Sequence, residues 1–322
     1  MDDRLLVASS PHIFARPSTR MIMLQVIIAL IPATIAGTWF FGKRSLLVCM
    51  TTISACVIAE YVARKMMKRE NTIGDLSAVV TGLLLALNLP PSIELWKAAV
   101  GGVVAIALVK QIFGGIGQNF MNPALAARVI ILMSWGESMT RWSLAGVDAV
   151  SSATPLAISK ELFQTGAASA ELPRYIDMFV GNIAGCIGET SAIALLIGGA
   201  YLLITRVISW EIPVTYIGTL AILTWILGGH NGLMTGDPLY HVLGGGLLLA
   251  AFFMATDYTT SPVTKKGKLI MGFGCGVLTA IIRLYTGYPE GASFAIIIMN
   301  VIVPLIDRYA IPKPFGGEKA SA

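Results

Sequence analysis

Charged residues are scarce in this sequence. Only 13% of its 322 residues are Asp, Glu, Lys or Arg, whereas 55% are hydrophobic. A soluble globular protein carries about 25% charged residues, so a lipid bilayer is the expected surrounding for most of the chain. The net charge of +5 is small, and basic residues in loops serve to set membrane orientation. Nucleic acid is therefore not expected as a partner.

Cysteine is also rare, and its spacing excludes the common thiolate sites. The four cysteines lie within apolar runs, and none forms a C-x-x-C pair: Cys49, Cys56, Cys186 and Cys275. A complete Fe–S or zinc site needs several thiolates at close spacing. The cysteines are therefore interpreted as small buried core residues, and no metal site is predicted.

A cleavable signal peptide is not evident either. Residues 1–20 lack an apolar core, and the first long apolar run, 21–41, is too long for a signal-peptide core. This run is predicted to span the membrane. Residues 1–20 are then a cytoplasmic N-terminal segment, and residues 311–322 are expected to form a cytoplasmic tail.

What the sequence does contain is a series of apolar runs. A helix that crosses a hydrocarbon core of about 30 Å needs about 20 residues. The runs predict an all-α, polytopic membrane protein with about ten transmembrane helices, at approximately 21–41, 45–63, 74–89, 95–113, 120–135, 181–205, 212–229, 239–256, 268–287 and 292–310. The third run ends at Asn88-Leu89-Pro90-Pro91, where proline stops a helix, so this helix is expected to stop short of the full bilayer.

The two halves of the chain are similar in pattern. Asn88 to Pro91 and Asn122-Pro123 flank a Gly-rich run in the first half, and Asp257 to Pro262 and Asn300 do so in the second, at an offset of about 171 to 178 residues. Five helices per half is an odd number, so the second repeat is predicted to be inverted, with ligand sites near the midplane. The predicted organisation is a first repeat over 21–135, a loop over 136–180 and a second repeat over 181–310.

Basic residues predict the orientation. They gather at 64–69 and 265–268, whereas the 136–180 loop is net acidic. Lys and Arg are enriched in cytoplasmic loops. The pattern predicts a multi-pass membrane protein, with both termini cytoplasmic and the 136–180 loop extracytoplasmic.

The polar loop contains a hydroxyl-rich motif. Residues 148–155 read Asp-Ala-Val-Ser-Ser-Ala-Thr-Pro. An acceptor of phosphoryl transfer must be an exposed hydroxyl on a segment that can enter another enzyme's active site, and Pro155 keeps this segment extended. Taken alone, Ser151, Ser152 and Thr154 would be read as ordinary turn or helix-cap residues.

The whole chain resembles the D subunit of the Rnf ion-translocating oxidoreductase and the related B subunit of the sodium-pumping NADH:quinone reductase. The resemblance lies in 148–156, 75–91, 119–128 and 288–300, at ordered spacing over most of the length. It implies FMN attached to Thr154 through a phosphoester, with Asp148, Ser151 and Ser152 in the acceptor motif. Ser152 stands where this family often has glycine.

The resemblance also implies a function and partners. The chain would act within an electron-transport complex that couples ferredoxin:NAD electron transfer to Na⁺ or H⁺ translocation. The assembled complex is expected to be the enzyme, a translocase of the bacterial inner membrane, and the activity of the isolated chain is left open. Implied partners are the A, B, C, E and G subunits of Rnf and a flavin transferase for maturation, and the family allows a non-covalent riboflavin. The first apolar run near residue 21 favours Rnf over the quinone reductase, whose corresponding subunit usually has a longer N-terminal extension. A small-solute channel or transporter is the alternative from another class.

Arg128 is the strongest polar candidate within a predicted helix. Its guanidinium could meet a flavin carbonyl, a phosphate or a carboxylate; the alternative is an ion pair that fixes helix packing, with Asp257 or Glu60. Arg128→Ala is predicted to perturb function more than loss of the solvated Lys160. A structural role near an interface is favoured for Glu60, Asn182, Glu189 and Asp307.

Overall fold

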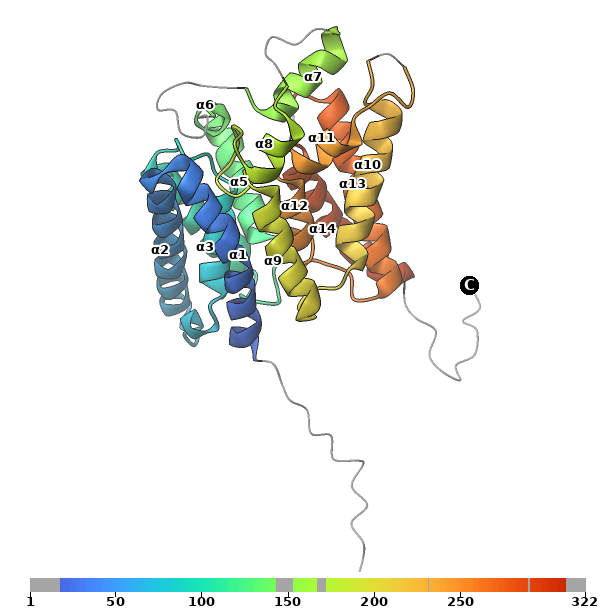
Figure 1. Cartoon of the computed structure of the whole chain (residues 1–322). Helices are drawn as coiled ribbons and strands as arrows, with labels where there is room; N and C mark the ends of the chain where they lie inside the picture. The colour runs from blue at the N-terminus through green and yellow to red at the C-terminus, as the bar shows by residue number, and fades with distance from the viewer. Residues whose placement is uncertain (1–17, 143–152, 167–171, 231, 289, 311–322) are drawn as a thin grey trace, which may run out of the picture.

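The computed structural model describes residues 18–142, 153–166, 172–230, 232–288 and 290–310. Within these ranges every regular element is a helix, and no strand occurs. The helices run side by side in one bundle, as Figure 1 shows. The described part of the chain thus confirms the predicted all-α class.

Helical segments occupy the predicted ranges. Four helices are long and apolar enough to cross a membrane: α1 (Thr19–Phe41), α2 (Lys43–Met66), α13 (Lys265–Tyr285) and α14 (Ala292–Tyr309). Shorter apolar helices are α3 (Ser77–Leu87), α5 (Pro123–Ser134), α9 (Ala192–Ile204) and α10 (Glu211–Leu227). At a rise of about 1.5 Å per residue, α3 covers only about half of a hydrocarbon core. This confirms that α3 stops short, before Pro90.

Two segments are not regular α-helices throughout. Helix α4 (Leu95–Val103) continues into the π-helix η2 (Val104–Gln111). The run predicted at 239–256 is broken into α11 (Pro238–Leu243), α12 (Leu247–Leu249) and the π-helix η3 (Ala250–Met254). The break falls at Gly244-Gly245-Gly246, where Gly245 and Gly246 have φ of 68° and 65°. Only glycine adopts these angles without strain, so the prediction of one continuous helix here was wrong.

The segment predicted at 181–205 is helical only in its second part. Residues 181–191 form turns, and α9 begins at Ala192 behind the N-cap Ser191. The turn region pairs with the end of α3, through bonds from Ile187 N to Leu89 O (3.1 Å) and from Gly188 N to Leu87 O (2.8 Å). A Cβ on Gly188 would lie 2.6 Å from the Leu87 side chain. The close approach at Gly188 holds this apolar segment in turns against α3. The apolar run predicted a helix here because hydropathy alone does not register such backbone contacts.

Three helices begin with a capping residue followed by proline. Asn122 accepts hydrogen bonds from Ala124 N and Leu125 N at the start of α5. Thr154-Pro155 opens α7 (Pro155–Thr165), and Asp237-Pro238 opens α11 in the same way. Proline is favoured at the first helical position because its missing N–H would be unpaired there. These dipeptides therefore fix where each helix begins.

The helices support a repeat with a uniform spacing. Helices α2 and α10 begin at Lys43 and Glu211, 168 residues apart, and α5 and α14 begin at Pro123 and Ala292, 169 residues apart. Helix α2 packs on α3 and α4, as α10 packs on α11 and α13. This spacing is slightly smaller than the predicted offset of about 171 to 178 residues. With its amide turned so that its nitrogen and oxygen are both satisfied, Asn300 accepts a hydrogen bond from Asn122 N at 3.0 Å.

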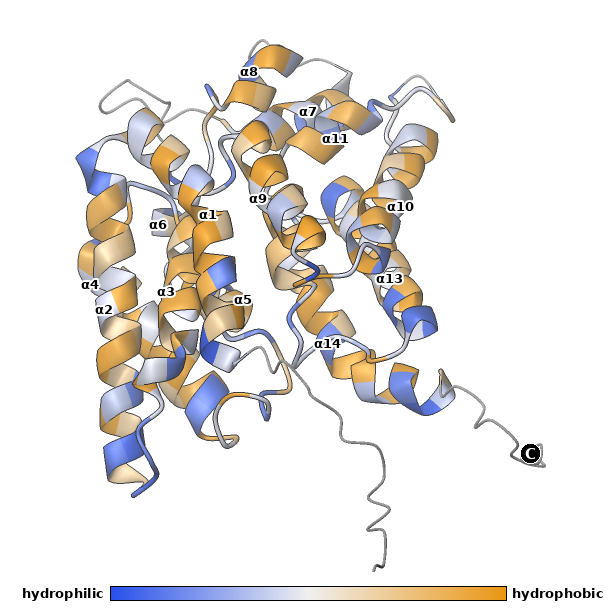
Figure 2. Ribbon diagram, turned by 60° about the horizontal axis from the view of Figure 1, so that its bottom comes forward, coloured by the Kyte–Doolittle hydropathy of each residue, from blue (hydrophilic) through white to orange (hydrophobic). Residues whose placement is uncertain are grey.

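The ends of the bundle differ. Helix α1 begins and α14 ends on one side, whereas α6 (Gly136–Thr140), α7 and α8 (Tyr175–Val180) lie on the opposite side (Figure 1). In Figure 2 the helix bodies are mostly hydrophobic, and hydrophilic residues concentrate near their ends. Exposed Ile28, Ile31 and Ile35 follow one face of α1, as expected for a helix against lipid.

Candidate functional site

Arg128 points into the bundle from α5 and is 4% exposed. Its Nε donates to Asn88 O at 3.0 Å, and its Nη1 donates to Ser293 Oγ at 2.6 Å. Nη2 forms an ion pair with Glu290. The last carbonyls of a helix have no partner within it. Arg128 satisfies the carbonyl of Asn88, the residue that directly follows α3. The ion-pair interpretation is confirmed, but the predicted partners Asp257 and Glu60 were wrong.

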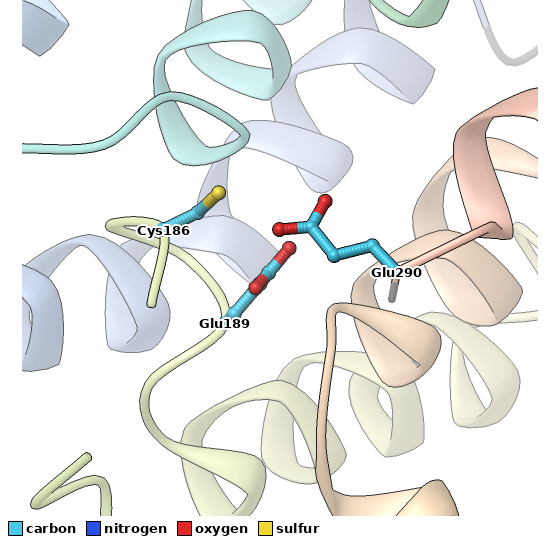
Figure 3. A group of neighbouring side chains, drawn as sticks. All are labelled: Cys186, Glu189 and Glu290. Carbon is cyan, nitrogen blue, oxygen red and sulfur yellow. The ribbon is translucent and has the colours of Figure 1, made fainter. Parts of the chain in front are cut away.

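A turn between α8 and α9 brings two more side chains to this place. Glu189 N donates to Cys186 O at 3.1 Å, which closes the turn. The Cys186 thiol donates to Asn88 O at 3.2 Å and lies 3.8 Å from Arg128 Nη2. Possible ligand atoms of Cys186, Glu189 and Glu290 all lie within 4.8 Å of one another. Figure 3 shows the three side chains pointing toward one another from two connecting segments.

A second buried arginine, Arg283 on α13, supports the other broken segment. Its Nε donates to Glu290 O at 2.8 Å, and its Nη2 donates to Gly244 O at 3.2 Å and Gly245 O at 3.0 Å. Nη1 donates to His241 O. Arg283 thus satisfies carbonyls released where the α11–α12 segment breaks, as Arg128 does at the end of α3.

Thr154 lies beside this cluster. It shares the lining of a cavity of about 10 Å³ with Glu189, Glu290 and Gly245. Its hydroxyl accepts a hydrogen bond from Ala157 N at 3.2 Å, and the residue is only 6% exposed. The Thr154 hydroxyl was expected to be freely exposed. It is instead partly enclosed and caps the start of α7. The other predicted acceptor residues, Asp148, Ser151 and Ser152, fall outside the described part of the chain.

Lys160 lies on α7 and is not the solvated loop residue that the sequence predicted. Its Nζ is buried and, among the described residues, has no hydrogen-bond partner. Burial lowers the pKa of Lys160, because the low-dielectric surrounding disfavours the charged form.

A much larger cavity, of about 370 Å³, opens at the other side of the bundle, where α1 begins. Most of its lining is apolar, with Asn119, Asn122, Thr256 and Asp257 among the polar lining residues. This volume lies within the usual range of about 300–1,000 Å³ for small-molecule sites. Asn119, Asn122 and Asp257 lie in segments that the sequence singled out, whereas Thr256 does not stand out, and nothing in the sequence places these residues in one cavity.

The remaining polar candidates have structural partners. The Glu60 carboxylate accepts from Thr72 Oγ1 (2.6 Å), Lys110 Nζ (2.9 Å) and Gln111 Nε2 (3.1 Å). Asp307 accepts from Val263 N at 3.2 Å. Cys186 and Glu290 are the functional candidates that sequence reasoning missed. Glu290 lay within the resembling 288–300 stretch, whereas Cys186 gave no signal beyond its apolar neighbours.

The described bundle has an apolar surface, and inside it buried arginines hold the ends of broken helices. These features define a multi-pass membrane protein with an internal polar site. The chain matches the NQR2, RnfD, RnfE family over residues 6–316. It belongs to this family.

The similar proteins are D subunits of membrane complexes. The chain is 49% identical to the D subunit of the Na(+)-translocating ferredoxin:NAD(+) oxidoreductase complex of Acetobacterium woodii, over 98% of this chain and 96% of that protein. It is 46% identical to the D subunit of the proton-translocating ferredoxin:NAD(+) oxidoreductase complex of Clostridium ljungdahlii, over 96% of each. The D subunit of the ion-translocating oxidoreductase complex of Halorhodospira halophila is 36% identical, over 98% and 97%.

Proposed function

We propose that this chain is the D subunit of an ion-translocating ferredoxin:NAD⁺ oxidoreductase complex. The observation that carries the proposal is its similarity, along nearly the full length, to D subunits at 49% and 46% identity. The chain then takes part in electron transfer that drives Na⁺ or H⁺ across the membrane, together with the A, B, C, E and G subunits of Rnf. These relatives favour this function over a quinone reductase component or a solute channel.

The function has a direct test in inverted membrane vesicles. Vesicles from cells that lack this chain should lose ferredoxin-dependent NAD⁺ reduction and the accompanying uptake of Na⁺ or H⁺. Complementation with the wild-type chain should restore both. Vesicles that keep both activities without the chain would contradict the proposal.

We further propose that a flavin transferase attaches FMN to Thr154. Thr154 sits at the N-terminus of the 11-residue helix α7, where unpaired amide groups and the helix dipole favour a phosphate. Attachment needs the Thr154 cap bond to open, which costs about 1 kcal/mol. The bound flavin would supply one-electron chemistry, and the residues around Thr154 would set its position and exclude water.

Flavin attachment can be tested by changing only the hydroxyl. In cells that contain the transferase, Thr154→Val should abolish the flavin fluorescence of the denatured band, because valine has no oxygen to accept the phosphoryl group. Thr154→Ser keeps the hydroxyl and should retain fluorescence. Ser151→Ala and Ser152→Ala are the matched controls and should remain labelled. Peptide mass spectrometry that finds Thr154 unmodified in the wild type would contradict the assignment.

A non-covalent riboflavin is proposed for the 370 Å³ cavity. Its apolar walls would take the ring system, and the side chains of Asn119, Asn122 and Asp257 offer hydrogen-bond partners. Val80 also lines the cavity, so Val80→Trp should fill it. The riboflavin recovered by acid extraction of the complex should then fall, while covalent flavin at Thr154 stays unchanged. Equal extracted riboflavin would contradict this site.

We propose that the side of the bundle where α1 begins and α14 ends faces the cytoplasm. The basic clusters 64–69 and 265–268 support it. Arg44 is a basic residue at the start of α2, on the proposed outer side. It has a structural role there, because its guanidinium donates to Pro91 O (3.1 Å) and to Ser92 O and Ile93 O (both 3.2 Å) beyond α3.

Cysteine labelling tests this orientation. The native cysteines are all buried, so a new cysteine gives the signal. Gly166 is unsuitable because its φ is +74° and a Cβ would lie 2.6 Å from His230. Exposed Gln164 is the better position. Gln164→Cys should react with an impermeant maleimide added to intact cells after the outer membrane is permeabilised, whereas Lys266→Cys should react only in inverted vesicles. The opposite pattern would overturn the proposed topology.

A further inference from the structure

An open groove lies between the end of α1 and the start of α2. The two helices meet at Gly42, on the side of the bundle that carries α6, α7 and α8 (Figure 1). The groove has a volume of about 370 Å³ and is lined by Thr34, Ile35, Thr38, Trp39 and Leu46. Ile35, Trp39 and Leu46 are 63%, 83% and 45% exposed. The groove therefore opens sideways, towards the lipid that surrounds an apolar helix bundle.

The two threonine hydroxyls of the groove are already used within α1. Thr34 Oγ1 donates to Leu30 O at 2.9 Å, and Thr38 Oγ1 donates to Thr34 O at 2.8 Å. Such bonds to the carbonyl four residues earlier are common for hydroxyls in apolar helices. The rest of the lining is apolar apart from the indole N–H of Trp39. The groove therefore suits a hydrocarbon chain better than a polar solute.

The length of the groove matches one leaflet of a bilayer. Helix α1 ends at Phe41, and at about 1.5 Å per residue Thr34 lies about 10 Å below that end. The whole hydrocarbon core is about 30 Å thick. Trp39 lies close to the helix end, at the level where tryptophan is enriched between headgroups and hydrocarbon. A transmembrane helix of another subunit needs a groove along the full length of α1, whereas a lipid needs only this part.

A lysine lies at the headgroup end of the groove. Lys43 directly follows Gly42, whose N–H donates to Thr38 O at 2.9 Å, and it precedes Leu46 by three residues on α2. Residues three apart share one face of a helix, so Lys43 lies on the same face of α2 as Leu46. The Lys43 side chain is exposed, and it takes part in none of the ion pairs among the described residues.

The charge of Lys43 complements an anionic headgroup. The neighbouring Arg44 is held by the carbonyls that follow α3, whereas Lys43 has no such structural role. Lysine can lay its aliphatic stem along an apolar surface and keep its ammonium group at the level of the headgroups. There the ammonium group can donate a charge-assisted hydrogen bond to a phosphate. An apolar groove with a cation at its polar end has the chemistry that recognises an anionic phospholipid.

We propose that the groove between α1 and α2 binds one anionic glycerophospholipid. An acyl chain lies along Ile35 and Leu46, and the phosphate contacts Lys43. The lipid belongs to the leaflet on the side of α6, α7 and α8. Because Arg44 holds residues 91–93, the bound lipid lies next to the connection between α3 and α4. The site does not involve the flavin at Thr154 and does not depend on the function proposed above.

Photolabelling of the purified complex tests the site. The probe is phosphatidylglycerol with a diazirine on one acyl chain, added after delipidation in detergent. Illumination should label the segment 34–46, read by peptide mass spectrometry. Excess unlabelled phosphatidylglycerol should remove this label, whereas phosphatidylcholine with the same chains should not. Equal competition by the two lipids would show an ordinary boundary contact and overturn the proposal. Absence of label from 34–46, as when another subunit covers the groove, would also overturn it.

Two substitutions separate the headgroup contact from the chain contact. Lys43→Gln should reduce the labelling about fivefold, the effect of one basic residue near an anionic lipid surface, and Lys43→Arg should retain it. Lys65→Gln is the matched control, because Lys65 is an exposed lysine at the other end of α2, and its labelling should equal the wild type. Leu46→Trp should fill the groove and lower the labelling. Unchanged labelling in both Lys43→Gln and Leu46→Trp would overturn the proposal.

Discussion

Two buried acidic sites in this bundle differ in how completely they are satisfied. The Glu60 carboxylate, between α2 and η2, receives donors at both oxygens: Lys110 Nζ at 2.9 Å on one, and Thr72 Oγ1 and Gln111 Nε2 at 2.6 and 3.1 Å on the other. In the Glu189–Glu290 pair, Glu290 Oε2 pairs with Arg128, whereas Glu290 Oε1 is buried and has no hydrogen-bond partner among the described residues. Glu60 is thus the more completely satisfied carboxylate, and a buried oxygen without a partner is an exception in folded proteins.

The local backbone explains part of this difference. Lys110 and Gln111 both lie at the end of the π-helix η2 and both reach Glu60. A π-helix shifts side chains relative to an α-helix, and such turns often occur at functional sites. Glu189 and Glu290 instead lie on connecting segments whose main-chain groups are held by α3 and by Arg283. The first site is built from helix faces, and the second from loops.

The largest effect is expected when Arg128 is removed. Arg128→Ala leaves Glu290 and Ser293 without the Arg128 donor and removes one of the two donors to Asn88 O. Loss of one partner of a buried pair costs about 3–5 kcal/mol. The thermal midpoint and the yield of assembled complex should fall strongly. Arg128→Ala/Glu290→Gln should recover part of the loss, because the pair is coupled.

Lys160→Ala is the control for this prediction. Its Nζ is buried but bonded to no described residue, so the substitution removes a charge without leaving a partner unpaired. Its effect on stability and on electron transfer should be smaller than that of Arg128→Ala. Equal rates for both variants and wild type, at equal complex abundance, would contradict a role for Arg128.

Lys110→Met should come next in magnitude. It leaves the Glu60 carboxylate buried without its cation, at a cost of about 3 kcal/mol. Glu60→Gln/Lys110→Met removes both charges and should restore most of the midpoint. If the single and double variants unfold at the same temperature, the pair does not stabilise the fold.

Glu189→Gln should act in the opposite direction from Glu60→Gln. In choline buffer, neutral glutamine removes a buried acidic group that lies close to Glu290, so the repulsion between the two carboxyl groups is lost and the unfolding free energy should rise by about 1–2 kcal/mol. Glu60→Gln should lower it, because Lys110 then loses its partner. Thermal unfolding in Na⁺-free detergent compares the two variants. A decrease of the same size in both would remove the distinction between the sites.

The smallest effect is expected at the helix cap. In the chain without attached flavin, Thr154→Ala removes the bond to Ala157 N and should cost about 1 kcal/mol. Thr154→Ser keeps the capping oxygen and should be close to the wild type. Hydrogen exchange of the first turn of α7 measures the change. Unchanged protection in Thr154→Ala would show that the cap does not hold the helix start.

The sequence by itself determined the helices. Apolar runs placed them within a few residues, because burial in lipid demands about 20 apolar residues per crossing. Pro90-Pro91 fixed the early end of α3. Thr154-Pro155 was predicted to lie in an extended loop segment, with a turn or helix cap as the alternative, and the structure shows that it begins α7. The exceptions, 181–191 and the break at 244–246, are apolar segments in which glycines allow close approach and positive φ. Hydropathy does not distinguish such segments from helix.

Only the tertiary structure decided the polar site. Arg128 and Glu290 are 162 residues apart in sequence, and Cys186 reaches the same place from a turn between α8 and α9. Periodicity reports which face of a helix is apolar, but it carries no information on which distant side chains meet. The partner of Arg128, and the unpartnered Oε1 of Glu290, follow from how the two halves pack, since a buried charge is satisfied or left unpaired only by its neighbours in space.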